Sequence, residues 1–408
     1  MNSTSTFGFS DLAKKASLQP KEELLEVNNP HQQLFIGVPK ETTLQEYRVP
    51  LTPSSIQLLV NNGNEVWIET NAGEHAHFTD KEFSDAGAKI CISKDEVFKA
   101  NIILKVEPPT ESEIKLLNSE HLLISALQHA SKDENYIRQL MQKKLNALAY
   151  EFLEDDKGVF PIVRSMSEIA GICTISIASE YLSSAKDGKG EMLGGVTGIP
   201  PTEIVIIGAG TVGEYATRSA LGNGASVKVF DPSLSRLRRL QNNFDTHVYT
   251  SLLHPKILEK ALHSADVVIG CLRSEDGRSQ VIITEEMVQN MKPKSVIIDI
   301  SVDQGGIFET SEMTSHKNPI FIKHGVIHYC VPNITSRACR TASYALSNIF
   351  TPILLKLSEA KDLSTFLYHH AGVRNGMYVF KGNLTNKHIG KRLNIYHKDI
   401  ELMLATHT

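Results

Sequence analysis

Short apolar runs alternate with amphipathic stretches along most of the chain. The runs at residues 34–38, 101–106 and 121–125 have the length and composition of buried strands, and helical spacing of apolar residues marks the segments between them. Repeated strand–helix units predict a parallel sheet covered by helices on both faces. Residues 1–33 are polar and weakly patterned, so we expect them to form an N-terminal extension outside the folded core.

The pattern changes near residue 166. A long helix is predicted over residues 167–182, and a glycine-rich passage follows it at 188–198. A second series of strands and helices then predicts about six parallel strands in a doubly wound sheet. A helix over residues 342–357 carries apolar side chains at helical spacing, and we expect it to run back to the first domain.

These boundaries predict an α/β protein with two parallel-sheet domains. Residues 34–165 together with residues 345–408 form the predicted substrate domain, and residues 166–344 form the predicted nucleotide domain. A chain of 408 residues is long enough for two hydrophobic cores. A ligand is expected in the cleft between the domains, beyond the carboxyl ends of the strands.

A glycine-rich turn opens the second domain. The apolar run at 203–207 leads into Gly208, Gly210 and Gly213, and a second apolar run ends at Asp231, 23 residues after the first glycine. This spacing predicts a dinucleotide site: Gly208 permits the tight turn, Gly210 lets a pyrophosphate approach the backbone, and Gly213 lets the helix pack closely. Asp231 would bind the ribose hydroxyls and repel a 2′-phosphate, which favours NAD. The alternative is an ordinary glycine-rich strand–helix turn.

Composition limits the possible partners. The net charge is −4 and no long basic run is present, so we expect no binding to nucleic acid or to a membrane surface. We also expect no apolar stretch long enough to span a bilayer, and the N-terminus lacks the pattern of a secretory signal, which favours a cytoplasmic protein. The spacing of His324 and His328 lacks the glutamate of H-E-x-x-H, and we predict no metal site.

Several ordered motifs carry a resemblance to a known family. They include Ile36-Gly-Val-Pro-Lys-Glu41, Glu46-Tyr-Arg-Val49, Met166-Ser-Glu-Ile-Ala-Gly171, Leu193-Gly-Gly-Val-Thr-Gly-Ile-Pro-Pro201, Asp303-Gln-Gly-Gly306 and His328-Tyr-Cys-Val-Pro-Asn333. From about residue 34 to 357 the chain resembles the alanine dehydrogenase and proton-translocating transhydrogenase α-subunit family. The last three motifs look more like alanine dehydrogenase. The resemblance implies two Rossmann-like domains, reversible NAD-dependent oxidative deamination of L-alanine to pyruvate and ammonia, and a homo-oligomer, often a hexamer.

The resemblance also assigns residues. Arg48 matches the family's substrate-carboxylate arginine, whose guanidinium fork suits a carboxylate. Lys105 matches the first lysine of a Lys-Val-Lys pattern, and Asp303 matches an active-site aspartate near the nicotinamide and the substrate amine. The coenzyme side is matched by Ser167 near the pyrophosphate, Asp231 at the ribose, Arg236 beside the adenosine and Asn333 in the nicotinamide pocket.

Two positions depart from the family pattern. The second lysine, which helps to hold the substrate carboxylate, falls on Glu107, and the catalytic histidine falls on Gln128. His129 is adjacent and would serve as the proton acceptor if its side chain points inward. A glutamate repels an incoming carboxylate, and a glutamine does not accept a proton at neutral pH. Three readings therefore stay open: alanine dehydrogenase, a related amino- or oxo-acid dehydrogenase, and an NAD(H)-binding regulatory protein with little catalysis.

Overall fold

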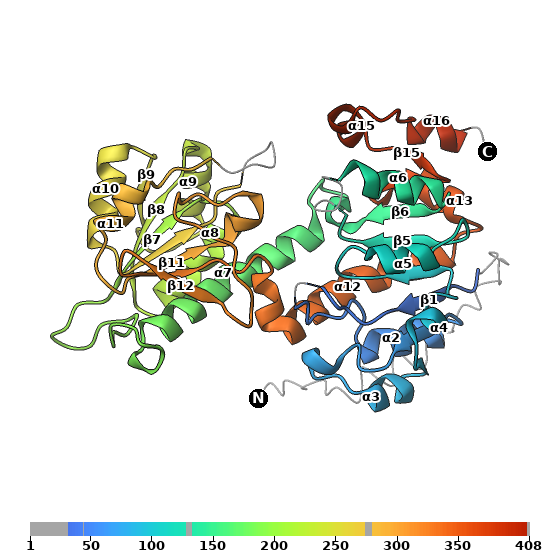
Figure 1. Cartoon of the computed structure of the whole chain (residues 1–408), viewed down its shortest axis with the longest axis horizontal. Helices are drawn as coiled ribbons and strands as arrows, with labels where there is room; N and C mark the ends of the chain where they lie inside the picture. The colour runs from blue at the N-terminus through green and yellow to red at the C-terminus, as the bar shows by residue number, and fades with distance from the viewer. Residues whose placement is uncertain (1–31, 44, 128–132, 274–279, 406–408) are drawn as a thin grey trace, which may run out of the picture.

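The computed structural model describes residues 32–405 except residue 44, residues 128–132 and residues 274–279. Two α/β domains lie side by side and two long helices run between them (Figure 1). The predicted N-terminal extension, residues 1–33, falls almost entirely outside the described residues.

The first domain is built on an eight-stranded sheet in the order β15-β14-β6-β5-β4-β1-β2-β3. Six neighbouring strands, from β6 to β3, are parallel, as the repeated strand–helix pattern predicted. The strands are β1 (Phe35–Val38), β2 (Glu65–Glu69), β3 (Lys89–Cys91), β4 (Ile102–Leu104), β5 (Leu122–Ser125), β6 (Asn146–Ala149), β14 (Met377–Phe380) and β15 (Asn383–Leu384).

Short helices connect these strands, and several begin at a side-chain cap. In α3 and α5 a threonine and a glutamate three residues later bond each other's backbone N–H groups, which satisfies two donors at the helix start. The helices of this domain are α2 (Pro53–Asn61), α3 (Asp80–Asp85), α4 (Lys94–Val97), α5 (Glu111–Leu116), α6 (Glu134–Gln142), α13 (Leu363–His369), α14 (Ala371–Arg374), α15 (Lys387–Leu393) and α16 (Ile400–Ala405), with 3₁₀ turns η1 (Glu74–Ala76) and η3 (Tyr150–Phe152).

The second domain has a seven-stranded sheet in the order β12-β13-β11-β10-β7-β8-β9. The six strands from β13 to β9 are parallel, and β12 is an antiparallel edge that the sequence pattern did not predict. The strands are β7 (Glu203–Ile207), β8 (Ser226–Phe230), β9 (Tyr249–Ser251), β10 (Val267–Gly270), β11 (Val296–Asp299), β12 (Ile320–Lys323) and β13 (Val326–Tyr329).

The helices of the second domain cover both faces of this sheet. Alternate residues of β7 enter different cores: Ile204 and Ile206 pack on one face, and Val205 and Ile207 pack on the other. The helices are α8 (Thr211–Gly222), α9 (Leu234–Asn242), α10 (Pro255–Ser264) and α11 (Glu285–Gln289), with 3₁₀ turns η4 (Ser184–Lys186), η5 (Ile300–Gln304) and η6 (Ile334–Ala338).

Two helices connect the domains: α7 (Pro161–Leu182) and α12 (Cys339–Ser358). The sequence predicted α7 from residue 167, but it begins at Pro161, whose fixed φ and missing N–H suit the first helical position. The predicted domain boundaries near residues 166 and 345 therefore fall inside continuous helices.

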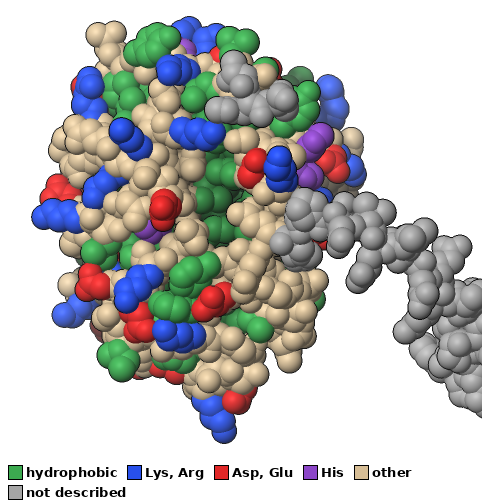
Figure 2. Space-filling model, turned by 90° about the vertical axis from the view of Figure 1, so that its right-hand side faces the viewer, with side chains coloured by type: hydrophobic (Ala, Val, Ile, Leu, Met, Phe, Trp, Pro, Cys, Tyr) green, Lys and Arg blue, Asp and Glu red, His purple; other side chains and the backbone are tan. Residues whose placement is uncertain are grey.

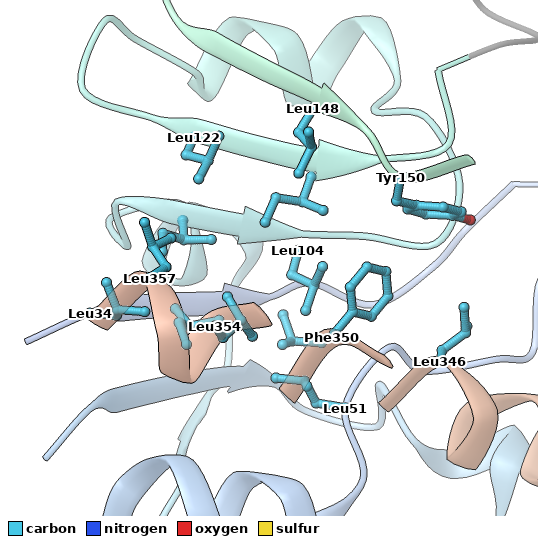
Figure 3. Close-up of a cluster of buried hydrophobic side chains, with 14 of the residues drawn as sticks. Leu34, Leu51, Leu104, Leu122, Leu148, Tyr150, Leu346, Phe350, Leu354 and Leu357 are labelled. Carbon is cyan, nitrogen blue, oxygen red and sulfur yellow. The ribbon is translucent and has the colours of Figure 1, made fainter. Parts of the chain in front are cut away.

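The later part of α12 completes the first core, as expected. Its apolar side chains face strand residues of the first sheet in Figure 3, and all of the labelled side chains belong to one buried cluster: Leu34, Leu51, Leu104, Leu122, Leu148, Tyr150, Leu346, Phe350, Leu354 and Leu357. The C-terminal tail then adds β14 beside β6, so the end of the chain belongs to the first domain.

Charge and hydropathy give two further facts about the fold. On the face in Figure 2, acidic and basic side chains are interspersed and hydrophobic side chains gather in a hollow near the centre.

Among the described residues, α7 is long and apolar enough by length and composition to cross a membrane, which corrects the expectation that no apolar stretch has that length. About 44% of the apolar 18-residue stretch within α7 is buried in the protein. Core helices of soluble proteins also reach this length and apolar composition.

Candidate active site

A cleft of about 450 Å³ separates the two domains. Its walls come from the carboxyl ends of the strands in both sheets and from the first half of α7, as predicted for a ligand site. The lining includes four of the predicted site residues, Arg48, Ser167, Asp303 and Asn333, and also Glu107, which departs from the family pattern. Other lining residues were not singled out as site residues from the sequence: Tyr150, Glu151, Met166, Arg273 and Gln304.

Arg48 lies on the loop after β1 and is held by Glu46. Its Nε donates to Glu46 Oε1 at 2.7 Å and its Nη2 donates to Glu46 Oε2 at 2.5 Å. Burial alone would lower the pKa of Arg48, but the attraction and hydrogen bonds of Glu46, with smaller contributions from Tyr150 and Glu107, together outweigh it and raise that pKa. The guanidinium is therefore a fixed cation whose remaining N–H groups face Met166 and Glu107.

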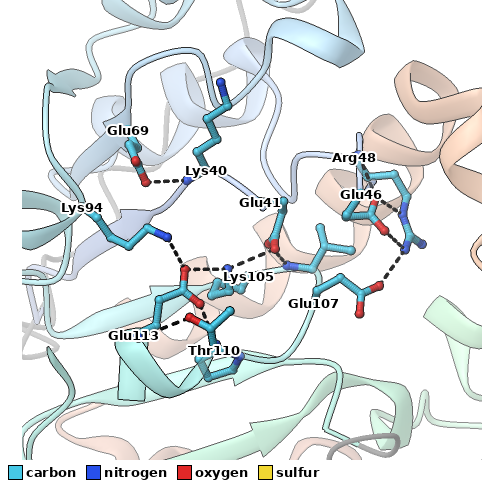
Figure 4. Close-up of polar contacts among 12 residues, drawn as sticks. Lys40, Glu41, Glu46, Arg48, Glu69, Lys94, Lys105, Glu107, Thr110 and Glu113 are labelled. Carbon is cyan, nitrogen blue, oxygen red and sulfur yellow. Dashed lines mark hydrogen bonds and ion pairs between the residues drawn. The ribbon is translucent and has the colours of Figure 1, made fainter. Parts of the chain in front are cut away.

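Glu107 follows β4 and points toward Arg48 (Figure 4). Its Oε1 lies 3.6 Å from Arg48 Nη2, and its side chain is 13% exposed, facing the cleft. Burial and the nearby charge of Glu46 raise the pKa of Glu107 to about 7, although Arg48 acts in the opposite direction. The cleft therefore contains a carboxyl group that titrates near neutral pH.

The backbone next to Glu107 is anchored by two hydrogen bonds of Val106. Val106 N–H donates to Glu41 Oε1 at 2.7 Å, and the Tyr150 hydroxyl donates to the Val106 carbonyl at 2.7 Å. Glu41 also accepts a bond from Lys105. The backbone that leads into Glu107 is thus held by Glu41 and Tyr150, which come from two other segments of the first domain.

Lys105 does not line the cleft. Its side chain is 2% exposed, and its Nζ lies 3.0 Å from Glu41 Oε2 and 3.3 Å from Glu113 Oε1. Burial alone would lower the pKa of Lys105, but the two carboxylates outweigh it and raise that pKa. The contact with a substrate carboxylate that the resemblance implied for Lys105 stays a prediction, and in this structure Lys105 holds buried carboxylates.

The opposite wall belongs to the second domain. Asp303 lies in the 3₁₀ turn η5 after β11, and Asn333 lies at the start of η6. The η5 turn is fixed by Asp299, whose carboxylate accepts bonds from the N–H groups of Ser301 and Ile307 and from the Ser311 hydroxyl. Asp303 and Arg48 therefore face the same cleft from different domains.

The glycine turn has the geometry that its spacing predicted. Gly208 has φ +120°, which favours glycine, and a Cβ on Gly213 would lie 1.8 Å from the Gly208 carbonyl oxygen. Around Gly210, at the N-terminus of α8, a Cβ would meet no protein atom within 4 Å. This open space beside unpaired helix N–H groups is a cradle of the kind that a pyrophosphate fills.

Asp231 ends β8 next to this turn and is fully buried. Its Oδ2 accepts the Ala209 N–H at 2.7 Å and its Oδ1 accepts the Ser233 N–H at 2.7 Å. Arg236 is exposed on α9, where its own backbone N–H donates to Ser233. Arg239, one turn further along the helix, reaches back and donates to the Ala209 carbonyl at 2.9 Å.

Sequence reasoning missed Glu46, Tyr150 and Arg239 as parts of the site. The spacing of Glu46 and Arg48 in an extended segment was a signal, because side chains two residues apart share one face. Nothing local to Tyr150 or Arg239 indicated a role. Gln128 and His129 lie outside the described residues. The described part of the chain has no group of three or more His, Cys, Asp or Glu side chains that would hold a metal ion.

Comparisons with known proteins agree with this arrangement. Residues 37–170 match the family model described as alanine dehydrogenase/PNT, N-terminal domain, and residues 174–387 match the corresponding C-terminal domain. An alanine dehydrogenase of Staphylococcus epidermidis is 36% identical over 367 residues, which is 90% of this chain and 98% of that protein. One of Staphylococcus saprophyticus is 36% identical over 372 residues, covering 91% of this chain and 100% of that protein.

Solved structures show the same likeness. An L-alanine dehydrogenase superposes with a TM-score of 0.82 at 34% identity, covering 90% of this chain and 99% of that one. A transhydrogenase from Sinorhizobium meliloti has a TM-score of 0.74 at 22% identity, covering 86% of this chain and 99% of that one, which shows the shared fold. The two domains match the family models in the same order along the chain, and the relatives align over about 90% of its length. The chain therefore belongs to the alanine dehydrogenase/PNT family.

Proposed function

We propose that this protein is an alanine dehydrogenase that interconverts L-alanine with pyruvate and ammonia, using NAD as coenzyme. The observation that supports it most is the position of Arg48, a fixed cation that faces Asp303 across the cleft. A guanidinium binds a carboxylate, and an aspartate binds an ammonium or orients a water. Alanine and pyruvate share a carboxylate, and their second carbon carries the amine or the carbonyl.

The coenzyme side fits a dinucleotide. The open space at Gly210 and the start of α8 suit a pyrophosphate, and Ser167, which lines the cleft, would lie near that pyrophosphate. Asp231 next to the turn disfavours a 2′-phosphate, which supports NAD over NADP. Bound there, the nicotinamide supplies a hydride acceptor or donor. Arg236 on α9 would interact with the adenosine end.

The protein's own groups bind and orient the substrate. Arg48 would pair with the carboxylate through its remaining N–H groups while Glu46 keeps the guanidinium plane fixed. Asp303 would bind the amine or position the attacking water, and Asn333 would help to shape the pocket around the reacting carbon. Movement of one domain toward the other would exclude water during hydride transfer.

Turnover tests the proposal directly. Pyruvate plus ammonium should cause oxidation of NADH by the full chain, and L-alanine plus NAD should give the reverse reaction. Replacing Arg48 by Lys keeps the charge and removes the planar fork, so KM for pyruvate should rise about 10–100-fold while NADH affinity stays unchanged. Absence of turnover in the wild type, together with intact NADH binding, would reject alanine dehydrogenase activity.

Coenzyme choice is tested at Asp231. Replacing Asp231 by Ser removes the negative charge. The variant should bind NADH more weakly, and the ratio of its affinities for NADH and NADPH should become smaller. Calorimetry with each coenzyme measures both affinities. A wild type that binds NADPH as tightly as NADH would contradict the choice of NAD.

A second candidate is an NAD(H)-binding regulatory protein. The observation that favours it is Glu107, whose carboxyl lies 3.6 Å from the cation that should bind the substrate. Calorimetry separates the two: an enzyme should bind the pyruvate analogue oxamate once NADH is present, and a sensor should bind NADH alone. A related amino- or oxo-acid dehydrogenase would turn over another 2-oxo acid faster than pyruvate.

We also propose a cytoplasmic homo-oligomer, as the family resemblance implies. Light scattering coupled to gel filtration would measure the mass of the assembly. A hexamer would agree with the proposal, and a monomer at micromolar concentration would reject it.

A further inference from the structure

Two carboxylates flank one guanidinium in the cleft. Glu46 holds Arg48 through two hydrogen bonds, and Glu107 approaches the same Nη2 from the cleft side at 3.6 Å. With both carboxylates ionised the group carries a net charge of −1 before any substrate arrives. An incoming substrate carboxylate would raise that to −2 around a single cation, in a site that excludes much of the water.

Only one of the two carboxylates can readily relieve this repulsion. Glu46 also accepts the Ser336 hydroxyl, and although burial alone would raise its pKa, Arg48 and Ser336 lower it. Glu107 makes no comparably short contact with Arg48 and faces the cleft. A proton that accompanies substrate binding therefore goes to Glu107.

We propose that Glu107 carries the reaction proton: it takes up a proton when a 2-oxo acid pairs with Arg48, and it gives that proton to the hydroxyl group that leaves the substrate. This inference rests on the proposed function and adds a catalytic residue to it. The acid fills the role that the resemblance assigns to position 128, where this chain has Gln128, because a side-chain amide is neither protonated nor deprotonated near neutral pH.

The groups around Glu107 suit this role. Glu46 and Glu41, on the loop after β1, disfavour the ionised form of Glu107, and Arg48 favours that form. Tyr150 lines the cleft just after β6. Asp303 and Arg273 line the same cleft from the second domain. The balance raises the pKa of Glu107 to about 7, close to the working pH, where an acid both holds and releases a proton efficiently. The hydrogen bonds of Val106 hold the backbone next to Glu107, whose side chain lines the cleft.

The step balances in atoms and charge. Ammonia adds to C2 of the oxo acid, forming the C–N bond, and one of its protons moves to the carbonyl oxygen to give a carbinolamine. The Glu107 acid then protonates the hydroxyl, the C–O bond breaks, water leaves, and the nitrogen lone pair forms the C=N bond. Glu107 is left as a carboxylate, and C2 is ready to accept hydride. In the direction of alanine oxidation, the Glu107 carboxylate removes a proton from the attacking water.

Proton uptake measured by calorimetry tests the binding half of the proposal. The full chain saturated with NADH is titrated with oxamate at pH 8 in buffers of different ionisation enthalpy. Wild type should take up close to one proton per oxamate, and Glu107→Gln should take up none. Glu111→Gln, on the exposed start of α5, is the matched control and should behave as wild type. No uptake in wild type, or unchanged uptake in Glu107→Gln, would overturn the proposal.

Rates test the catalytic half. Glu107→Gln and Glu107→Lys should bind oxamate at least as tightly as wild type, because a repulsive charge is gone, yet their kcat should fall about 10²–10⁴-fold. If Glu107 only repels substrate, both variants will instead show a higher kcat/KM. That result rejects the role of Glu107 alone, whereas absent turnover in wild type rejects the proposed function itself.

Discussion

The Ser336 hydroxyl donates a hydrogen bond of 2.6 Å to Glu46 Oε1, the oxygen that also accepts the Nε of Arg48. Ser336 lies in η6, beside the core of the second domain, and Glu46 lies on a loop of the first. Tyr47 N–H donates to the same hydroxyl at 3.4 Å. The cation that should bind the substrate is therefore oriented in part by the other domain.

Removing this hydroxyl should weaken substrate binding more than folding. In Ser336→Ala, Glu46 loses a buried hydrogen bond of about 1–2 kcal/mol, so Arg48 is held less firmly. KM for pyruvate should rise about 3–10-fold and kcat should change less. Ser347→Ala is a control, because Ser347 lies on α12, accepts the N–H of Thr52 and does not touch the Glu46–Arg48 pair. Equal KM effects in the two variants would contradict this account.

Substitutions of the glycines at the two ends of α8 should separate an effect on coenzyme affinity from an effect on stability. A Cβ at Gly210 meets no protein atom within 4 Å, so Gly210→Ala should leave the melting temperature nearly unchanged and weaken NADH binding at least 10-fold. Gly222→Ala, in the last position of the same helix and equally open, should bind NADH as wild type does and should be more stable by about 0.4–1 kcal/mol. Fluorescence titration and thermal unfolding measure these effects, and unaltered NADH affinity in Gly210→Ala would place the pyrophosphate elsewhere.

Lys105 should matter for stability rather than for substrate affinity. Lys105→Met leaves Glu41 and Glu113 without their shared buried cation, and the expected loss is about 3–5 kcal/mol of unfolding free energy. Urea unfolding measures the loss. At a temperature where the variant is folded, oxamate affinity in the presence of NADH should change less than about 3-fold, and a much larger change would support direct contact with the substrate.

Glu107 should make stability fall as pH rises. The ordinary pKa of a glutamate is 4.5, and in the folded protein burial and Glu46 raise the pKa of Glu107 to about 7. Between these values the native state binds more protons than the unfolded state, so the free energy of unfolding decreases with pH and the penalty is complete above pH 7. The shift corresponds to about 3 kcal/mol. Urea unfolding between pH 5 and pH 8 measures the free energy of unfolding at each pH, and Glu107→Gln should lack this decrease with pH. The same dependence on pH in wild type and variant would contradict the prediction.

The sequence predicted the parallel strands well because each is a continuous apolar run that is buried on both faces. The runs that became β1, β4, β5 and β7 all lie where the pattern placed them. The sequence pattern missed β12, because an edge strand need not be a continuous run buried on both faces. It also missed the pairing of β14 with β6, because antiparallel pairing depends on contacts between distant segments. The start of α7 was missed because residues 161–166 have weak helical periodicity.

The sequence by itself determined the two-domain fold and the glycine turn, because apolar periodicity and the spacing of glycines act locally. Arg48 was marked by the family resemblance of its motif. Only the tertiary structure decided which charges share the cleft. Lys105 and Glu107 are two residues apart, yet one holds buried carboxylates and the other faces Arg48. Their partners lie on two other segments, Glu41 and Glu46 on the loop after β1 and Glu113 on α5. The pKa of a carboxyl depends on the distance to such charges and on burial, neither of which a linear pattern contains.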